Sequence, residues 1–290
     1  MSQHELLHQW VTWLAPSETA AAFLGRVRLE PLITGTPLLD RLCPLPLRPG
    51  HVVEVAGPSG SGKTDLLVQI AVHCILGRSV GGEEGNILFM DLDGKFDVLR
   101  VLQQLHASLK GAQGLVLSDA HMDKEVGHAL SRLHVMHCPS PAAFLDGLQS
   151  AGELMASWPG TPCLLVDNVA AFFHLERAAG AAAGEQGASM HARALGTLRD
   201  LACAKQAVVV ASKLSLFGPQ QDRSTSAEGG ALGHREFMPR AWQDSVTHRL
   251  LLAPAAPAKV AGPLFVATWD MPACSGRHYF DISDAGICML

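Results

Sequence analysis

The sequence lacks an excess of positive charge and has few charged residues of either sign. Of its 290 residues, 22 are Lys or Arg and 27 are Asp or Glu, so the net charge is −5 and charged residues make up 17%. Typical soluble domains carry about 25%. The balance excludes a protein that coats nucleic acid or membranes with a basic surface, although it permits a local DNA-binding loop. The small share of charged residues suggests that another protein covers part of the surface.

Cysteine pairs, a secretion signal and long apolar runs are also missing. The seven cysteines are an odd number, spread widely, with no C-x-x-C pair, which argues against a disulfide framework and a zinc ribbon. The N-terminus has no basic segment followed by an apolar one, and no uncharged run reaches the roughly 18 residues of a membrane span. With 48% hydrophobic residues, the chain has enough apolar side chains for a large core. These features predict a soluble protein of a reducing compartment, the cytosol or the nucleus.

Apolar runs alternate with helical patterns over most of the chain. We expect strands at 51–56, 86–91, 133–138, 163–167 and 207–212, and helices at 65–76, 97–109, 141–157 and 188–205. This alternation predicts an α/β fold in which a mostly parallel central sheet has helices on both faces. Later strands at 247–253, 264–269 and 278–282 have short links, and they predict an antiparallel C-terminal extension.

Two kinds of segment depart from this order. Residues 1–30 form a predicted N-terminal helical segment, which either packs on its own domain or docks a partner through Trp10 and Trp13. The core domain is expected to occupy 31–290. Segments 176–190 and 215–240 are rich in small and polar residues and follow predicted strands, on the side of the sheet where α/β proteins bind ligands. We expect both to be mobile loops.

One motif is a complete phosphate-binding loop, G-x-x-x-x-G-K-T, placed between a predicted strand and a predicted helix. Its residues are Gly57, Pro58, Ser59, Gly60, Ser61, Gly62, Lys63 and Thr64. The glycines let backbone N–H groups turn toward phosphate oxygens, and the following helix presents its positive end. We expect Lys63 to reach the β- and γ-phosphates of ATP and Thr64 to hold Mg²⁺.

Three aspartates are candidates for the rest of the site. Asp167 ends the apolar strand CLLVD, where a charge is costly unless it faces a ligand or a cation, so it is the expected second holder of Mg²⁺. Asp91 and Asp93 end the strand in FMDLDGKF, and we assign Asp93 the catalytic position together with Lys63. The alternative interpretation of Asp167 is purely structural, as a helix N-cap or a turn residue. Histidine is plentiful, but His134 and His137 point to opposite faces of one strand, and no metal other than Mg²⁺ is predicted.

Several motifs together resemble RecA-like recombinases of the eukaryotic and archaeal branch. The run ITGTPLLDRLCPLPLRPGHVVEVAGPSGSGKTDLL is similar to the entry into that family's ATPase core. FMDLDGKFDVLRV resembles the strand that carries the family's catalytic acid, and CLLVDNVAAFF resembles its magnesium-binding strand. The late residues Ala241-Trp242-Gln243 and His248-Arg249 resemble a segment of the eukaryotic recombinase paralogues. The likeness covers roughly residues 32–283.

The sequence departs from active recombinases at three places. Asp93 stands where they have Glu, so an attacking water is less well placed and slow ATP hydrolysis is expected. Lys213 stands where they have a Gln that senses the γ-phosphate, and it either touches phosphate or lies exposed. The segment 176–190 holds mostly Ala and Gly where active recombinases have basic residues. Strand exchange by this chain alone is therefore not expected.

The resemblance implies an ATP-binding subunit, with Mg²⁺, in homologous-recombination repair of DNA double-strand breaks. It implies a nuclear complex with other recombinase paralogues, especially the D-type one, which assists recombinase loading on single-stranded DNA. Contact with single-stranded or branched DNA is expected through that complex. Two alternatives stay open: an autonomous DNA-stimulated ATPase with strand-pairing activity, and a small-molecule kinase. A kinase lid is usually rich in arginine, whereas 215–240 holds only Arg223, Arg235 and Arg240.

Overall fold

The computed structural model describes residue 19 and residues 31–111, 118–183, 189–215, 236–255 and 265–290. The chain separates into two units, Met1–Glu30 and Pro31–Leu290. Apart from Thr19, the predicted helical segment 1–30 lies outside the described residues.

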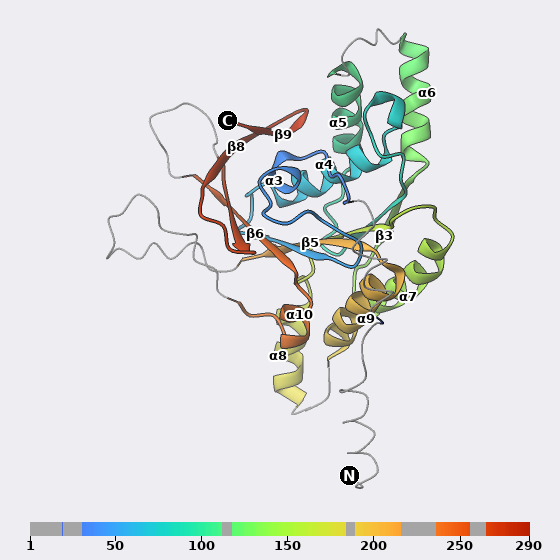
Figure 1. The fold of residues 1–290 in the computed structure, drawn as a ribbon. Coiled ribbons are helices and arrows are strands. Elements are labelled where there is room, and N and C mark those ends of the chain that lie inside the picture. The colour runs from blue at the N-terminus through green and yellow to red at the C-terminus, as the bar shows by residue number, and fades with distance from the viewer. Residues whose placement is uncertain (1–18, 20–30, 112–117, 184–188, 216–235, 256–264) are drawn as a thin grey trace. The chain divides into compact units, whose positions relative to one another are not determined.

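The second unit is built on one nine-stranded sheet in the order β3-β2-β4-β5-β1-β6-β7-β8-β9 (Figure 1). The strands are β1 (Val52–Gly57), β2 (Ile87–Asp91), β3 (Leu133–His137), β4 (Cys163–Asp167), β5 (Val208–Leu214), β6 (His248–Pro254), β7 (Phe265–Met271), β8 (His278–Ser283) and β9 (Gly286–Met289). Pairing is parallel from β3 to β6 and antiparallel from β6 to β9. The predicted α/β class, the mostly parallel sheet and the antiparallel extension are confirmed.

Helices cover both faces of the parallel part of the sheet, as Figure 1 shows. The α-helices are α3 (Pro37–Asp40), α4 (Lys63–Ile75), α5 (Val98–Gly111), α6 (Asp119–Leu130), α7 (Pro141–Ala156), α8 (Phe173–Ala183), α9 (Met190–Lys205) and α10 (Arg240–Gln243), and a 3-10 turn spans Arg78–Val80. One apolar core joins the sheet to α4, α5 and α6, and the other joins it to α7, α9 and α10. Every residue of β1, β2 and β4 is buried, as expected for strands covered on both sides.

The structure differs from the sequence-based expectation at three elements. Helix α6 was not predicted, because only Val126 and Ala129 are buried in it and the rest of its sequence shows no apolar stripe. Strand β9, four residues long, was also missed. The expected loop 176–190 is wrong as far as residue 183, because α8 runs through the alanine-rich segment. Residues 184–188 of that segment and residues 216–235 of the second expected loop lie outside the described residues.

None of the helices within the described ranges is long and apolar enough to cross a membrane.

Gly57, at the end of β1, allows the chain to pass close to β6. A methyl group added there would lie 2.3 Å from the Leu252 carbonyl oxygen and 2.6 Å from the Ser61 hydroxyl. We expect Gly57→Ala to lower the free energy of unfolding by about 1–3 kcal/mol, because two backbone segments must move apart. Gly196→Ala is the control, since Gly196 lies inside α9 with no atom within 4 Å of the added group.

Urea unfolding of the two variants tests this explanation. Alanine in a helix is favoured over glycine by about 1 kcal/mol, so Gly196→Ala should be neutral or stabilising. Equal stability of the two variants would show that close packing at Gly57 is not what requires glycine there.

Candidate functional site

The predicted phosphate-binding loop connects β1 to α4 and turns in a way that two of its glycines permit. Gly60 and Gly62 have φ angles of 70° and 85°, a left-handed conformation that other residues rarely adopt. Gly62 also directly precedes α4, and a side chain there would lie 2.6 Å from the Ile282 Cδ1 atom of β8. Ser59 and Gly60 form the exposed tip, whereas Ser61 is buried. The loop therefore presents backbone N–H groups at the positive end of a 13-residue helix.

Lys63 begins α4, and its side chain folds back over the loop. Its Nζ atom donates a hydrogen bond of 2.6 Å to the Pro58 carbonyl and lies 3.4 Å from the Ser61 hydroxyl. Burial lowers the pKa of Lys63 to about 8, and the negative charge of Asp167 partly opposes that shift. The ammonium group is thus held inside the loop, on neutral partners that an anionic phosphate can replace.

Thr64 and Asp167 contact each other at the carboxyl ends of the parallel strands, although 103 positions separate them in the chain. The Thr64 hydroxyl donates to Asp167 Oδ2 at 2.7 Å, and the Ser212 hydroxyl on β5 donates to Asp167 Oδ1. Asp167 is 3% exposed, and burial raises the pKa of its carboxyl group, while the hydrogen bonds from Ser212 and Thr64 act in the opposite direction. Carboxylate and hydroxyl oxygens are the ligands that Mg²⁺ prefers, so this pair fits the ion that the sequence implies.

The two aspartates that end β2 have different environments. Asp91 is buried, and its carboxylate accepts hydrogen bonds of 3.1 Å from the backbone N–H groups of both Lys95 and Phe96. Asp93 is partly exposed, and its Oδ2 lies 3.0 Å from the Lys95 ammonium. The backbone N–H of Asp93 also donates to the Asp167 carbonyl at 3.3 Å. Asp91 therefore fixes the loop backbone, whereas the Asp93 carboxylate is partly exposed and pairs with Lys95.

Lys213 is buried and its ammonium is held by carboxylates, so the sequence-based expectation that it lies exposed is wrong. Its side chain has no exposed area, and its ammonium lies 2.8 Å from Glu54 and 2.9 Å from Glu236. Arg249 contacts the same two carboxylates at 2.6 Å and 2.9 Å. Trp242 adds a hydrogen bond of 2.5 Å from its ring nitrogen to Glu54.

We call this group the Glu54 cluster; its members are Glu54, Lys213, Glu236, Trp242 and Arg249. It joins strands β1, β5 and β6 and helix α10 to Glu236, which belongs to no helix or strand. The sequence carried one signal of it: two opposite charges lie inside apolar strands, in VVEVAG and VVVASKL. Buried charges of this kind are paired in folded proteins.

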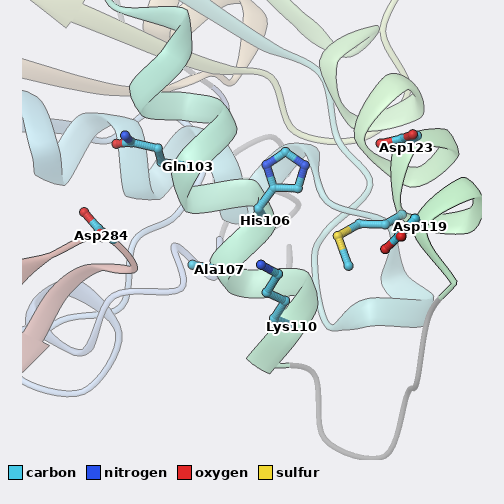
Figure 2. A pocket seen from close by; sticks show the side chains of 8 residues that line it. Gln103, His106, Ala107, Lys110, Asp119, Asp123 and Asp284 are labelled. Carbon is cyan, nitrogen blue, oxygen red and sulfur yellow. The ribbon is translucent and has the colours of Figure 1, made fainter.

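Besides the predicted nucleotide site, the structure has a hollow of about 580 Å³, which we call the second hollow, and none of its lining residues is predicted to bind nucleotide. Figure 2 shows that α5 and α6 form its walls and that Asp284, in the turn between β8 and β9, lies at one side. Its lining combines Lys110 and His106 of α5 with Asp119 and Asp123 of α6, so charges of both signs face it. Sequence analysis missed this hollow because it did not predict α6.

The expected site residues are thus brought to one edge of the sheet. Lys63 and Thr64 come from the phosphate-binding loop, Asp167 from the end of β4, and Asp93 from the loop after β2. Strands β2 and β4 are neighbours, with Asp91 opposite Asp167 in the register. A glycine-containing loop before a helix and a buried hydroxyl–carboxylate pair are groups suited to bind a nucleotide with its cation, so these residues form the candidate nucleotide site.

Comparison with known proteins agrees with this arrangement. A family model described as an AAA domain matches residues 18–213. The chain is 28% identical to DNA repair protein XRCC2 of Mus musculus over 82% of this chain and 84% of the relative. It is 28% identical to the XRCC2 homolog of Arabidopsis thaliana over 84% of this chain and 79% of the relative. DNA repair protein RAD51 homolog 4 of Bos taurus is 31% identical over 48% of this chain and 40% of its own length.

The sequence motifs also bear on the choice among recombinase paralogues. Asp93 and the string FDVLR resemble X-ray repair cross-complementing protein two, and the matches to XRCC2 from an animal and a plant confirm that resemblance. The matched family covers more than half of the chain. The chain therefore belongs to the AAA domain family, within which it is a RecA-like recombinase paralogue.

Proposed function

We propose that this chain is an ATP-binding subunit that supports homologous-recombination repair of DNA double-strand breaks, within a nuclear complex of recombinase paralogues. The observation that carries the proposal is the contact between Thr64 and Asp167, 2.7 Å across the end of a complete phosphate-binding loop. In a chain similar to XRCC2 and RAD51 homologues, that contact supports the proposal of a nucleotide site.

The nucleotide is ATP, bound with Mg²⁺. Backbone N–H groups of Gly57–Thr64 and the positive end of α4 bind the phosphates, and Lys63 adds a charge at the β- and γ-phosphates. Thr64 and Asp167 hold Mg²⁺, which neutralises charge on the phosphate oxygens. In the free protein the Lys63 ammonium lies on the Pro58 carbonyl, and it exchanges that partner for phosphate when ATP binds.

Hydrolysis is slow, and ATP acts mainly as a ligand for assembly. Asp93 is the acid beside the site, but its side chain is one methylene shorter than Glu and its carboxylate is engaged by Lys95. Positioning contributes much of the rate in phosphoryl transfer, so a poorly placed acid leaves binding more intact than turnover. Bound ATP favours the complex only if its affinity differs between the free and the assembled subunit.

The partners are other recombinase paralogues, among which the D-type one is the first choice. The similarity to RAD51 homolog 4 covers less than half of this chain and supports a shared ATPase core. Single-stranded or branched DNA is contacted through the complex, which acts on loading of the main recombinase. The net charge of −5 agrees with a subunit that makes little DNA contact by itself.

The test is to purify the tagged full-length chain from its own cells and to identify bound proteins by mass spectrometry. Stoichiometric recovery of recombinase paralogues, reduced for a Lys63→Ala variant at the same expression level, is the expected result. Recovery of the chain alone, or only as a self-assembled filament, would overturn the subunit function. Fast DNA-stimulated ATP turnover by the purified chain would favour the autonomous ATPase instead.

A further inference from the structure

The loop between β2 and α5 is held in a fixed shape by its own hydrogen bonds. The buried Asp91 carboxylate accepts both the Lys95 and the Phe96 N–H groups at 3.1 Å. Gly94 has a φ of 68°, which provides the turn between them. Asp97 accepts the Leu99 N–H at 2.8 Å where α5 begins. These hydrogen bonds define the backbone shape of residues 93–95.

This loop presents one cation, Lys95, toward solvent. Its ammonium lies 3.0 Å from Asp93 Oδ2, and the two side chains are 63% and 22% exposed. Exposed ion pairs of this kind contribute only about 0–1 kcal/mol. A triphosphate carries several negative charges, so it competes effectively with one solvated carboxylate for the same ammonium.

A continuous series of contacts connects Lys95 to the phosphate-binding loop. Lys95 pairs with Asp93, the Asp93 N–H donates to the Asp167 carbonyl, and the Asp167 carboxylate accepts from Thr64. The pKa of Lys95 is raised first by its hydrogen bond to Asp93 and further by the charges of Asp167 and Asp91. Lys63 in turn has its pKa lowered mainly by burial, with the positive charge of Lys95 acting in the same direction.

We propose that Lys95 is a ligand of the terminal phosphate: when a nucleoside triphosphate binds, its ammonium group leaves Asp93 for a γ-phosphate oxygen. This inference rests on the proposed nucleotide site. Asp93, released from the ion pair, then has a free carboxylate beside the γ-phosphate that can accept a hydrogen bond from water. A nucleoside diphosphate has no phosphate at that place and leaves the pair intact. Lys95 therefore makes the site distinguish ATP from ADP.

The test measures the affinities of the purified full-length chain for ATP and ADP, each with Mg²⁺, by competition with a fluorescent nucleotide. Lys95→Met should lower ATP affinity about tenfold, the effect of losing a hydrogen bond between charged groups, and leave ADP affinity unchanged. Lys95→Arg should keep most of the preference. Lys110→Met is the matched control, because Lys110 is also exposed but lines the second hollow.

The variant Asp93→Asn shows whether Lys95 contacts the phosphate directly or only neutralises the charge of Asp93. If Lys95 binds phosphate, adding Lys95→Met to Asp93→Asn still lowers ATP affinity relative to Asp93→Asn alone. No further loss in that background would overturn the inference, since Lys95 would then act only by cancelling the Asp93 charge.

The failures of the two proposals can be told apart. A wild-type chain that binds neither nucleotide contradicts the nucleotide site itself, and this inference with it. A wild-type chain that binds both, with the same ATP-to-ADP ratio in Lys95→Met, overturns only the role of Lys95. Lys95 is mostly exposed, so the variants should fold, and thermal unfolding checks that they do.

Discussion

Replacing Lys63 with alanine should lower the affinity for ATP by about ten- to a hundredfold, the largest effect expected from a single change in the site. The Lys63 ammonium is the one charge held inside the phosphate-binding loop, where its present partners are the neutral Pro58 and Ser61 oxygens. Alanine leaves the backbone N–H groups in place but removes a charge that is largely buried, since Lys63 is 9% exposed. Isothermal titration of ATP with Mg²⁺ measures the loss.

Lys110→Ala is the control for this measurement, since it removes the same charge from a different helix. Its ATP affinity should match that of the unmodified chain. Unchanged affinity in Lys63→Ala would contradict the assignment of Gly57–Thr64 as the place where phosphates bind.

The pH dependence of ATP binding provides a second readout of Lys63. Burial lowers its pKa to about 8 in the free protein, and phosphate binds the protonated form. Lys63 is therefore mostly charged at pH 7. Above pH 8 it is mostly neutral, so Lys63 must take up a proton when ATP binds. Affinity should fall by up to about tenfold per pH unit above 8, and this decline should disappear in Lys63→Ala. A decline of equal slope in both proteins would assign it to another group.

The residues of the candidate site could be selected from the sequence because their signals are local. The phosphate-binding loop is one unbroken motif. Asp167 ends an apolar strand, where burying a charge is unfavourable unless a ligand or polar groups contact it. Parallel strands bring their carboxyl ends to one edge, so the placement of Thr64 opposite Asp167 follows from the strand order. The sequence assigned the catalytic position to Asp93, but it could not show that Asp91 accepts two backbone N–H groups, because the turn at Gly94 brings those groups to it.

Lys213 shows where sequence reasoning failed. Its position after an apolar strand suggested a place near phosphate or solvent, but its charge is neutralised by residues far away in the chain. Glu54 lies on β1, and Glu236 follows a segment that no periodicity places. An ion pair formed over such separations depends on tertiary packing, which local patterns do not report. The second hollow was missed for a similar reason, since it exists only where α6 meets α5.

The Glu54 cluster should be the most sensitive point of the fold. Lys213→Met is expected to lower the free energy of unfolding by about 3–5 kcal/mol, because the buried Glu54 carboxylate loses a cation that contacts it at 2.8 Å. Glu54 has no exposed area, and Arg249 is the remaining described cation that contacts both Glu54 and Glu236. Urea unfolding followed by circular dichroism measures the change.

Arg199→Met is the matched control, because it breaks an ion pair on the surface. The side chains of Arg199 and Asp200 are 49% and 68% exposed. Such a pair should contribute no more than about 1 kcal/mol. ATP affinity distinguishes the two roles considered for Lys213, provided that it is measured at a temperature where both variants are folded. A structural lysine gives a large loss of stability and nearly unchanged affinity. Loss of ATP affinity with normal stability would instead mean that Lys213 turns from Glu54 to the phosphate, and the cluster would then be a feature of the nucleotide-free state alone.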